Sequence, residues 1–376
     1  MNRQLLRQVV AVLLAAGAVF AAPAPLAEKE LDAGARAAIG RGLDWLQKNQ
    51  TTNGCWSNAQ FPALTALPLW AVCGARDPGR TAMADKATAF ILSCVQTNGG
   101  IYVDIPGRRG GGLANYNTAI CLTALHATGR KDLTRTILDA RAFVAGSQHL
   151  GDDVYAGGFG YDRETKRAYT DLDNTMFAME AMRRTQGFED LRPAGEKRVD
   201  VDWKAALSYV SKLQNPAAAG TNDAGGFAYN PDDAKAGLVT NAAGKVFLRS
   251  FGSITYAGLL SLVYAEVSRA DPRVQSAVDF AARHWTLDEN PGMGSQGLYF
   301  YYDVMGRALA AARLDAVPRA GGAEIRWREE LARKMIALQR PDGAWANADN
   351  RFWENDPALA TAYALVALEN AAGLEP

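Results

Sequence analysis

The chain repeats one unit along most of its length, and this repeat constrains the fold more than any other feature. In each unit an apolar, helix-like run ends in Gln, and a Gly followed by an aromatic or aliphatic residue comes soon after. The clear copies end at Gln50, Gln96, Gln148, Gln214 and Gln339, and a degraded sixth copy at 280–298 lacks the Gln. Units of this kind cannot bury their apolar face alone and stack on their neighbours.

Each unit contains two helices of different character. The first is amphipathic, as in "DWKAALSYVSKLQ" (202–214), and the second is apolar on most sides, as in "GSITYAGLLSLVYA" (252–265). A helix that is apolar all round belongs in an interior. Six such pairs predict an all-α fold, an (α/α)6 toroid of six helical hairpins with an inner ring of apolar helices and an outer ring of amphipathic helices. An open solenoid is the alternative, but the burial implied for the second helices favours a closed ring.

The N-terminal segment differs from the rest of the chain. Arg3 and Arg7 precede an apolar run over 9–20, and small residues follow at a plausible cleavage site. These features predict a signal peptide over 1–21, followed by a linker over 22–34 and the toroid over 35–376. We therefore expect a periplasmic or secreted protein with no transmembrane segment after signal cleavage.

Composition excludes several classes of partner. Lys+Arg and Asp+Glu each number 40, so there is no basic field and we expect no nucleic acid partner. The three histidines have no D-x-C partner, so we expect no metal and no cofactor. The four cysteines permit a disulfide in an exported chain, but three lie in apolar helical patterns, which favours buried free thiols. We expect a monomer.

The stretch "TDLDNTMFAM" (170–179) places two carboxylates just before an apolar helix. Either Asp171 or Asp173 could be the N-cap of a helix that begins at Asn174, since Asp is a favoured cap. One cap explains one carboxylate and does not require two. The alternatives for these residues are a polar role in a pocket or a catalytic proton donor.

The Gln…Gly-x-Trp signature resembles the QW repeat of terpenoid cyclases and protein prenyltransferases over roughly residues 35–372. More narrowly, "GLYFYYDVMGRAL" (297–309) and "RFWENDPALATAYALVALE" (351–369) are similar to the secreted bacterial prenyltransferase/squalene oxidase repeat proteins. The resemblance implies a toroid with an aromatic-lined central pocket for an isoprenoid-like ligand. It places Asp173 at the middle, proton-donating position of the D-x-D-D motif of class II cyclases, with Asn174 in place of the last Asp.

If the inner helices run parallel, their N-termini gather at one mouth of the barrel. We expect a polar rim there over an aromatic pit that binds a small apolar or amphipathic ligand. Asp173 and Asp171 are the candidate catalytic residues. The residues expected to line the pocket are Asn115, Tyr116, Asn174, Thr175, Tyr256, Tyr299, Tyr301, Tyr302, Asp303, Trp353, Glu354 and Asp356.

Two other functions fit the same fold. A carbohydrate-active hydrolase or lyase would use paired carboxylates, for which the candidates are Asp171, Asp173, Asp303, Glu354 and Asp356, with Trp353 as a sugar platform. A binding protein or scaffold would have no catalytic residues at all. The sequence leaves open whether the protein is an enzyme.

Overall fold

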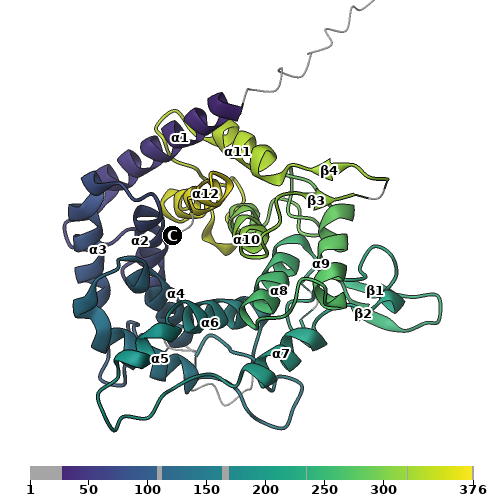
Figure 1. Cartoon of the computed structure of the whole chain (residues 1–376), viewed down its shortest axis with the longest axis horizontal. Helices are drawn as coiled ribbons and strands as arrows, with labels where there is room; N and C mark the ends of the chain where they lie inside the picture. Colours follow the sequence, from purple (N-terminus) through teal and green to yellow (C-terminus); the bar gives the residue numbers. More distant parts are fainter. Residues whose placement is uncertain (1–27, 108–111, 163–168, 234, 320, 375–376) are drawn as a thin grey trace, which may run out of the picture.

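The computed structural model describes residues 28–107, 112–162, 169–233, 235–319 and 321–374. The expected signal peptide, 1–21, lies outside these residues. The described residues form two concentric rings of helices (Figure 1). The inner helices are α2 (Ala63–Gly74), α4 (Ala114–Ala127), α6 (Leu172–Arg184), α8 (Gly252–Tyr264), α10 (Leu298–Ala311) and α12 (Pro357–Ala371). The outer helices are α1 (Glu28–Asn49), α3 (Thr81–Ser93), α5 (Thr134–Ala145), α7 (Trp203–Lys212), α9 (Pro272–Arg283) and α11 (Trp327–Leu338).

The inner ring is closed. Each inner helix packs against the two inner helices beside it, and α12 completes the circle by packing against α2. The described residues of α8 and α12 are buried on nearly all sides. The predicted (α/α)6 toroid is therefore confirmed, and the open solenoid is excluded. Helix α1 begins at Glu28, so part of the segment taken as a linker, 28–34, is helical.

Short elements interrupt the loops between the rings. Two antiparallel hairpins project from the outer side, β1 (Leu238–Thr240) with β2 (Val246–Leu248), and β3 (Val317–Pro318) with β4 (Glu324–Ile325). The sequence analysis missed them because strands of two or three residues are too short to show an alternating pattern. Five short 3-10 helices complete the described elements: η1 (Pro78–Arg80), η2 (Lys131–Leu133), η3 (Gln186–Leu191), η4 (Ala217–Ala219) and η5 (Arg351–Trp353).

Four of the five repeated glutamines join their unit to the next, whereas Gln96 donates to the carbonyl oxygens of Cys94 and Tyr102 in its own unit. The Nε2 group of Gln214 donates to the carbonyl oxygen of Gly225 in its own turn, at 2.9 Å, and to that of Arg273 at the start of α9, at 2.8 Å. Gln50 and Gln148 make the same pair of hydrogen bonds to their own turn and to the next unit. Gln339 joins Gly343 to Ala38 of α1, and this bond links the last unit to the first.

The glycine of each turn is required by the same contact. A Cβ atom at Gly225, where φ is +82°, would lie 2.1 Å from the backbone oxygen of Ser276 in α9. Equivalent clashes with the backbone of the next outer helix occur at Gly54, Gly99, Gly157 and Gly343. Only glycine adopts this backbone conformation without strain and leaves room for the neighbouring helix.

A threonine in the inner helix completes the link. After the turn of five units, a backbone N–H donates to a threonine hydroxyl in the inner helix of the same unit. The N–H of Phe227, for example, donates to Thr255 of α8 at 3.1 Å. The same bond occurs at Thr65, Thr118, Thr175 and Thr361. In the degraded unit the hydroxyls of Tyr301 and Tyr302 donate instead to the carbonyl oxygens of Thr286 and Leu287.

The four cysteines are free thiols, and three of them are buried. None of the described helices is long and apolar enough to cross a membrane.

We predict that Gly225→Ala destabilises the protein far more than Gly244→Ala. Both glycines have a positive φ, +82° and +78°, so both variants share the strain of about 1–2 kcal/mol for a left-handed alanine. Only Gly225 faces a neighbouring backbone, since nothing lies within 4 Å of a Cβ at Gly244. The clash should lower the free energy of unfolding by roughly 2 kcal/mol more. Urea denaturation of both variants measures this difference, and equal losses would contradict the proposed role of the turn.

Candidate functional site

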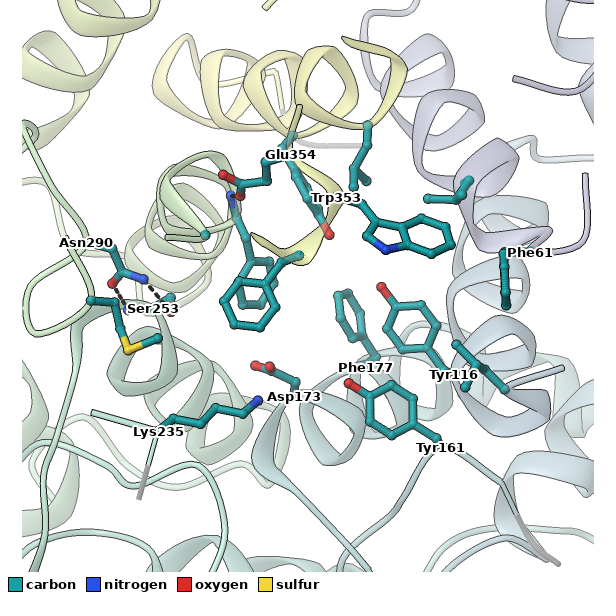
Figure 2. A pocket seen from close by; sticks show the side chains of 18 of the residues that line it. Phe61, Tyr116, Tyr161, Asp173, Phe177, Lys235, Ser253, Asn290, Trp353 and Glu354 are labelled. Carbon is teal, nitrogen blue, oxygen red and sulfur yellow. Dashed lines mark hydrogen bonds between the residues drawn. The ribbon is translucent and has the colours of Figure 1, made fainter. Parts of the chain in front are cut away.

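A cavity of about 210 Å³ opens at the mouth where the inner helices begin. Its lining comes from the first turns of these helices and from the loops before them, as the parallel arrangement of the inner ring predicts. Most of the lining is aromatic or aliphatic, and the polar side chains within it are Asp173, Lys235, Ser253, Asn290 and Glu354. Figure 2 shows Asp173 and Lys235 extending toward each other on the same side of the cavity.

Aromatic rings from four inner helices form one continuous wall. Phe177 of α6 packs edge-on against Tyr116 of α4, with ring centroids 5.7 Å apart, and its centroid lies 6.2 Å from that of Phe300 of α10. The ring of Phe300 in turn packs against Tyr363 of α12, with ring centroids 5.7 Å apart. These spacings lie in the range of favourable aromatic pairs, and all four rings line the cavity.

Asp171 is the N-cap of α6. Its Oδ1 atom accepts a hydrogen bond from the backbone N–H of Asn174 at 2.8 Å, and its Oδ2 atom accepts one from the Asn174 side chain, also at 2.8 Å. Asp171 is fully buried and does not line the cavity. The cap interpretation of this stretch therefore applies to Asp171, and Asn174 serves to orient it.

Asp173, two residues later, has no such role. It lines the cavity, and its Oδ1 atom is buried without a hydrogen-bond partner among the described residues. Burial raises the pKa of Asp173 to about 7, the Asp171 carboxylate acts in the same direction, and the positive charge of Lys235 opposes both. Near neutral pH this carboxyl group therefore exists in both protonation states.

Lys235 is the functional candidate that the sequence analysis missed. It reaches the cavity from the loop before β1, and its Nζ atom lies 3.0 Å from the centroid of the Tyr229 ring. Within the described part of the chain its ammonium has no carboxylate in ion-pair contact. Burial lowers the pKa of Lys235, against the effect of Asp173 and Asp171. No sequence signal identifies it, because the loop lies outside the repeat.

Three of the expected pocket residues line the cavity, Tyr116, Trp353 and Glu354, together with the candidate catalytic residue Asp173. Glu354 also has a structural role, because its carboxylate accepts hydrogen bonds from the backbone N–H groups of Tyr299 and Phe300 at 3.2 and 2.8 Å. Burial raises the pKa of Glu354, whereas these N–H groups and Asn347 lower it. Glu354 thus caps α10 from the following unit.

The tyrosines of α10 lie outside the cavity lining. A helix turns each successive side chain by about 100°, so only Phe300 of the aromatic run 299–302 faces the cavity. Tyr301 and Tyr302 are buried and hydrogen-bonded to the loop below, and Tyr256 packs against Tyr301. Tyr299 packs edge-on against Tyr302.

The other expected residues also have structural partners instead of a place in the cavity lining. The side chain of Asn115 donates to the carbonyl oxygen of Gly160 at 2.7 Å, and Thr175 belongs to the repeated threonine link. Asp303 forms a buried ion pair with Arg307, at 2.6 Å. Asp356 is the N-cap of α12. These residues were selected because they are polar at helix starts, which is also where capping requires polar residues.

Most of the helix starts at this mouth are capped by a side chain, three of them by a residue of the next unit. Asn117 accepts from the N–H of Ala63 at the start of α2, at 2.8 Å, and Asn290 accepts from that of Ser253 in α8, at 2.9 Å. With Asp171 on α6, Glu354 on α10 and Asp356 on α12, five of the six starts carry a side-chain cap. The N–H groups that could attract an anion are therefore largely occupied.

The cavity has a closed floor. The guanidinium of Arg307 lies 5.6 Å from the centroid of Phe177, on the inner side of the aromatic wall. It forms ion pairs with Glu180 and Asp303, each at 2.6 Å, and all three groups are buried. The ring centre is thus filled below Phe177, and the cavity is a pit at one mouth.

Two aromatic residues form part of the outer rim. Phe352 and Trp353 have positive φ values of +61° and +65° and are 44% and 46% exposed. Trp353 packs edge-on against Phe61, with centroids 5.2 Å apart. Bulky residues with a left-handed backbone are strained. This strained segment of the loop lies at the cavity, since both residues line it.

Within the described residues no group of His, Cys, Asp and Glu side chains is arranged to hold a metal ion. On one side of the cavity the carboxyl group of Asp173 and the amine of Lys235 extend toward each other, and we call this side its polar end.

No protein-family model matches the chain, and no curated protein sequence matches it either. Solved structures do. The type II terpene cyclase MstE from Scytonema matches with a TM-score of 0.58 and 12% identity, over 91% of this chain and 99% of that one. An α-1,6-mannanase from Salegentibacter matches with a TM-score of 0.58 and 11% identity, over 91% of this chain and all of that one. A protein from Actinoplanes matches with a TM-score of 0.53 and 15% identity, over 90% of this chain and 99% of that one. The chain therefore shares the α/α toroid fold of terpene cyclases and mannanases.

Proposed function

We propose that the mouth cavity binds a small amphipathic molecule of isoprenoid-like character and that Asp173 acts on its polar end as a proton donor. The apolar body would lie against the wall formed by Tyr116, Phe177, Phe300 and Tyr363. One observation carries the proposal: a carboxyl group with an unpartnered oxygen faces an aromatic cavity and has a pKa raised to about 7.

The raised pKa suits general acid catalysis. A proton donor works best when its pKa lies near the working pH, because it is then protonated yet still able to release the proton. Ring faces near the donor would stabilise positive charge that develops on the ligand. A related neighbour, a variant of the Scytonema terpene cyclase, was solved in complex with geranylgeranyl dihydroxybenzoate. This supports an isoprenoid-like ligand by analogy of fold.

The size of the cavity limits the ligand. At about 210 Å³ it is smaller than typical pockets for drug-sized molecules, which begin near ~300 Å³. We infer that it encloses a small molecule, or one end of a longer molecule whose remainder passes the rim at Trp353.

The carbohydrate-active alternative has less support. Hydrolysis of a glycosidic bond generally needs two carboxyl groups that face the substrate. Asp171 and Asp356 are engaged as caps, Asp303 pairs with Arg307, and both oxygens of Glu354 accept hydrogen bonds. Among the described candidates, Asp173 alone has an uncommitted oxygen facing the cavity.

The protonation of Asp173 makes a prediction about stability. Its pKa is higher in the folded protein, about 7, than in the unfolded chain, about 3.9. The folded state therefore binds more protons between these values, and the contribution of Asp173 to stability is lost as the pH rises from 4 to 7. Asp173→Asn removes this loss. We expect it to raise the free energy of unfolding by roughly 1–3 kcal/mol at pH 8 and to change it little at pH 4.

Asp171→Ala is the matched control. It removes a helix cap and should lower the free energy of unfolding by about 1–2 kcal/mol at pH 8. Denaturant titrations at pH 4 and pH 8 compare the two variants. A loss of stability for Asp173→Asn at pH 8 would show that its carboxylate is a structural partner, and the proton-donor proposal would fail.

The ligand itself can be sought directly. We expect organic extraction of the full chain, purified from its native envelope, to release a small apolar or amphipathic molecule in stoichiometric amount, identified by mass spectrometry. Incubation of that molecule with the protein should give a product, and Asp173→Asn should abolish the conversion while retaining binding. Recovery of a sugar would favour the carbohydrate alternative, and binding without conversion would favour a non-catalytic binding protein.

A further inference from the structure

The polar end of the cavity holds a cation without a counterion in direct contact. The Lys235 ammonium rests on the face of Tyr229 and forms no ion pair with the described residues, although it is partly buried in an apolar cavity. Charged groups in such surroundings are normally paired. Asp173 lies on the same side of the cavity, and its oxygen Oδ1 is also without a partner.

We propose that the space between these two groups binds the carboxylate of an amphipathic acid, held by the Lys235 ammonium and by the protonated carboxyl of Asp173. The inference rests on the proposed ligand cavity and names the chemical class of its ligand. A carboxylate has two oxygen atoms, so it can accept one hydrogen bond from each group. Both bonds involve a charged partner and are therefore stronger than neutral ones.

The surroundings favour a single negative charge. One ammonium and one acid proton match a carboxylate, whereas a diphosphate would need several cations or free helix N-termini. The helix starts at this mouth are largely capped, so they offer little further attraction. The charged and titratable groups that act on Asp173 or Lys235 are Asp171, Asp233, Arg351, Tyr116, Tyr161 and Tyr229.

These neighbours leave Asp173 and Lys235 as the groups whose titration affects binding, and Asp173 is the one with a pKa of about 7. The tyrosines stay neutral, because burial raises the pKa of Tyr116, Tyr161 and Tyr229. When Asp173 loses its proton it no longer donates, and its negative charge repels the ligand and attracts Lys235. Only the protonated fraction of the protein is then competent to bind, so the apparent dissociation constant should rise about tenfold for each pH unit above 7.

Isothermal titration calorimetry with decanoate and with decan-1-ol tests the proposal on the full mature chain between pH 6 and pH 9. Decanoate stays ionised and decan-1-ol stays neutral over this range. We expect decanoate binding to weaken about tenfold between pH 8 and pH 9, and decan-1-ol binding to remain constant. Asp173→Asn keeps a hydrogen-bond donor but cannot ionise, so its decanoate binding should weaken less with rising pH than that of the wild type and should be tighter at pH 9.

Lysine variants complete the test. Lys235→Met should weaken decanoate binding at pH 6 by roughly tenfold or more, because a charge-assisted hydrogen bond is lost. Lys245→Met is the matched control, since Lys245 also lies over an aromatic ring, 5.0 Å from the centroid of Phe247, but on the exposed β1–β2 hairpin. This variant should bind like the wild type. Thermal unfolding of each variant verifies that the fold is retained.

The outcomes separate this inference from the proposed function. If decan-1-ol binds and decanoate shows no preference for low pH, the apolar cavity stands and the carboxylate site is wrong. If Asp173→Asn retains the pH dependence, a different group controls binding and the inference is overturned. If neither compound binds at any pH, both the carboxylate site and the small amphipathic ligand are contradicted.

Discussion

The structure depends on one recurring hydrogen-bond link between neighbouring units. In four of the six units a glutamine amide joins the turn of its own unit to the following outer helix, and a glycine in the turn lets the two backbones come together. Each link alone contributes on the order of 1 kcal/mol. They also contribute to closure, because Gln339 of the last unit bonds to Ala38 of α1 in the first. Closure of the ring buries the inner helices on all sides.

Closure also determines where a ligand can bind. All inner helices start at the same mouth, and most of these starts are capped by a side chain, often from the next unit. Because these polar side chains and helix N–H groups bond to each other, few of them remain free to hydrogen-bond a ligand at the rim. Below the mouth, aromatic rings and the buried ion pairs of Arg307 with Glu180 and Asp303 fill the centre. The remaining space is a shallow apolar pit with few uncommitted polar atoms.

Asp173 and Lys235 differ from the other polar groups at the mouth, because neither caps a helix or forms an ion pair among the described residues. Natural proteins usually pair buried charges, yet these two side chains face the same cavity without a direct bond to each other. Burial shifts the pKa of both toward the neutral form, upward for Asp173 and downward for Lys235. The charged form of both groups is therefore disfavoured, in contrast to the Arg307 network, where each charge has a bonded partner. This contrast between structural and uncommitted charges is the physical basis for the function that we propose for the mouth.

The sequence by itself determined the ring and the number of its units, because the Gln and Gly of the link and the apolar second helices recur along the chain. It also identified Asp173, Tyr116, Trp353 and Glu354 as residues of the mouth. It did not separate Asp171 from Asp173, since both are good caps and only the backbone geometry shows which one accepts the N–H of Asn174. It selected Tyr299, Tyr301 and Tyr302 in place of Phe300, because the rotation of α10 depends on its packing between α8 and α12. Only the tertiary structure brought Lys235 to the cavity, because its loop carries no periodic signal and its position depends on contacts with residues distant in the chain.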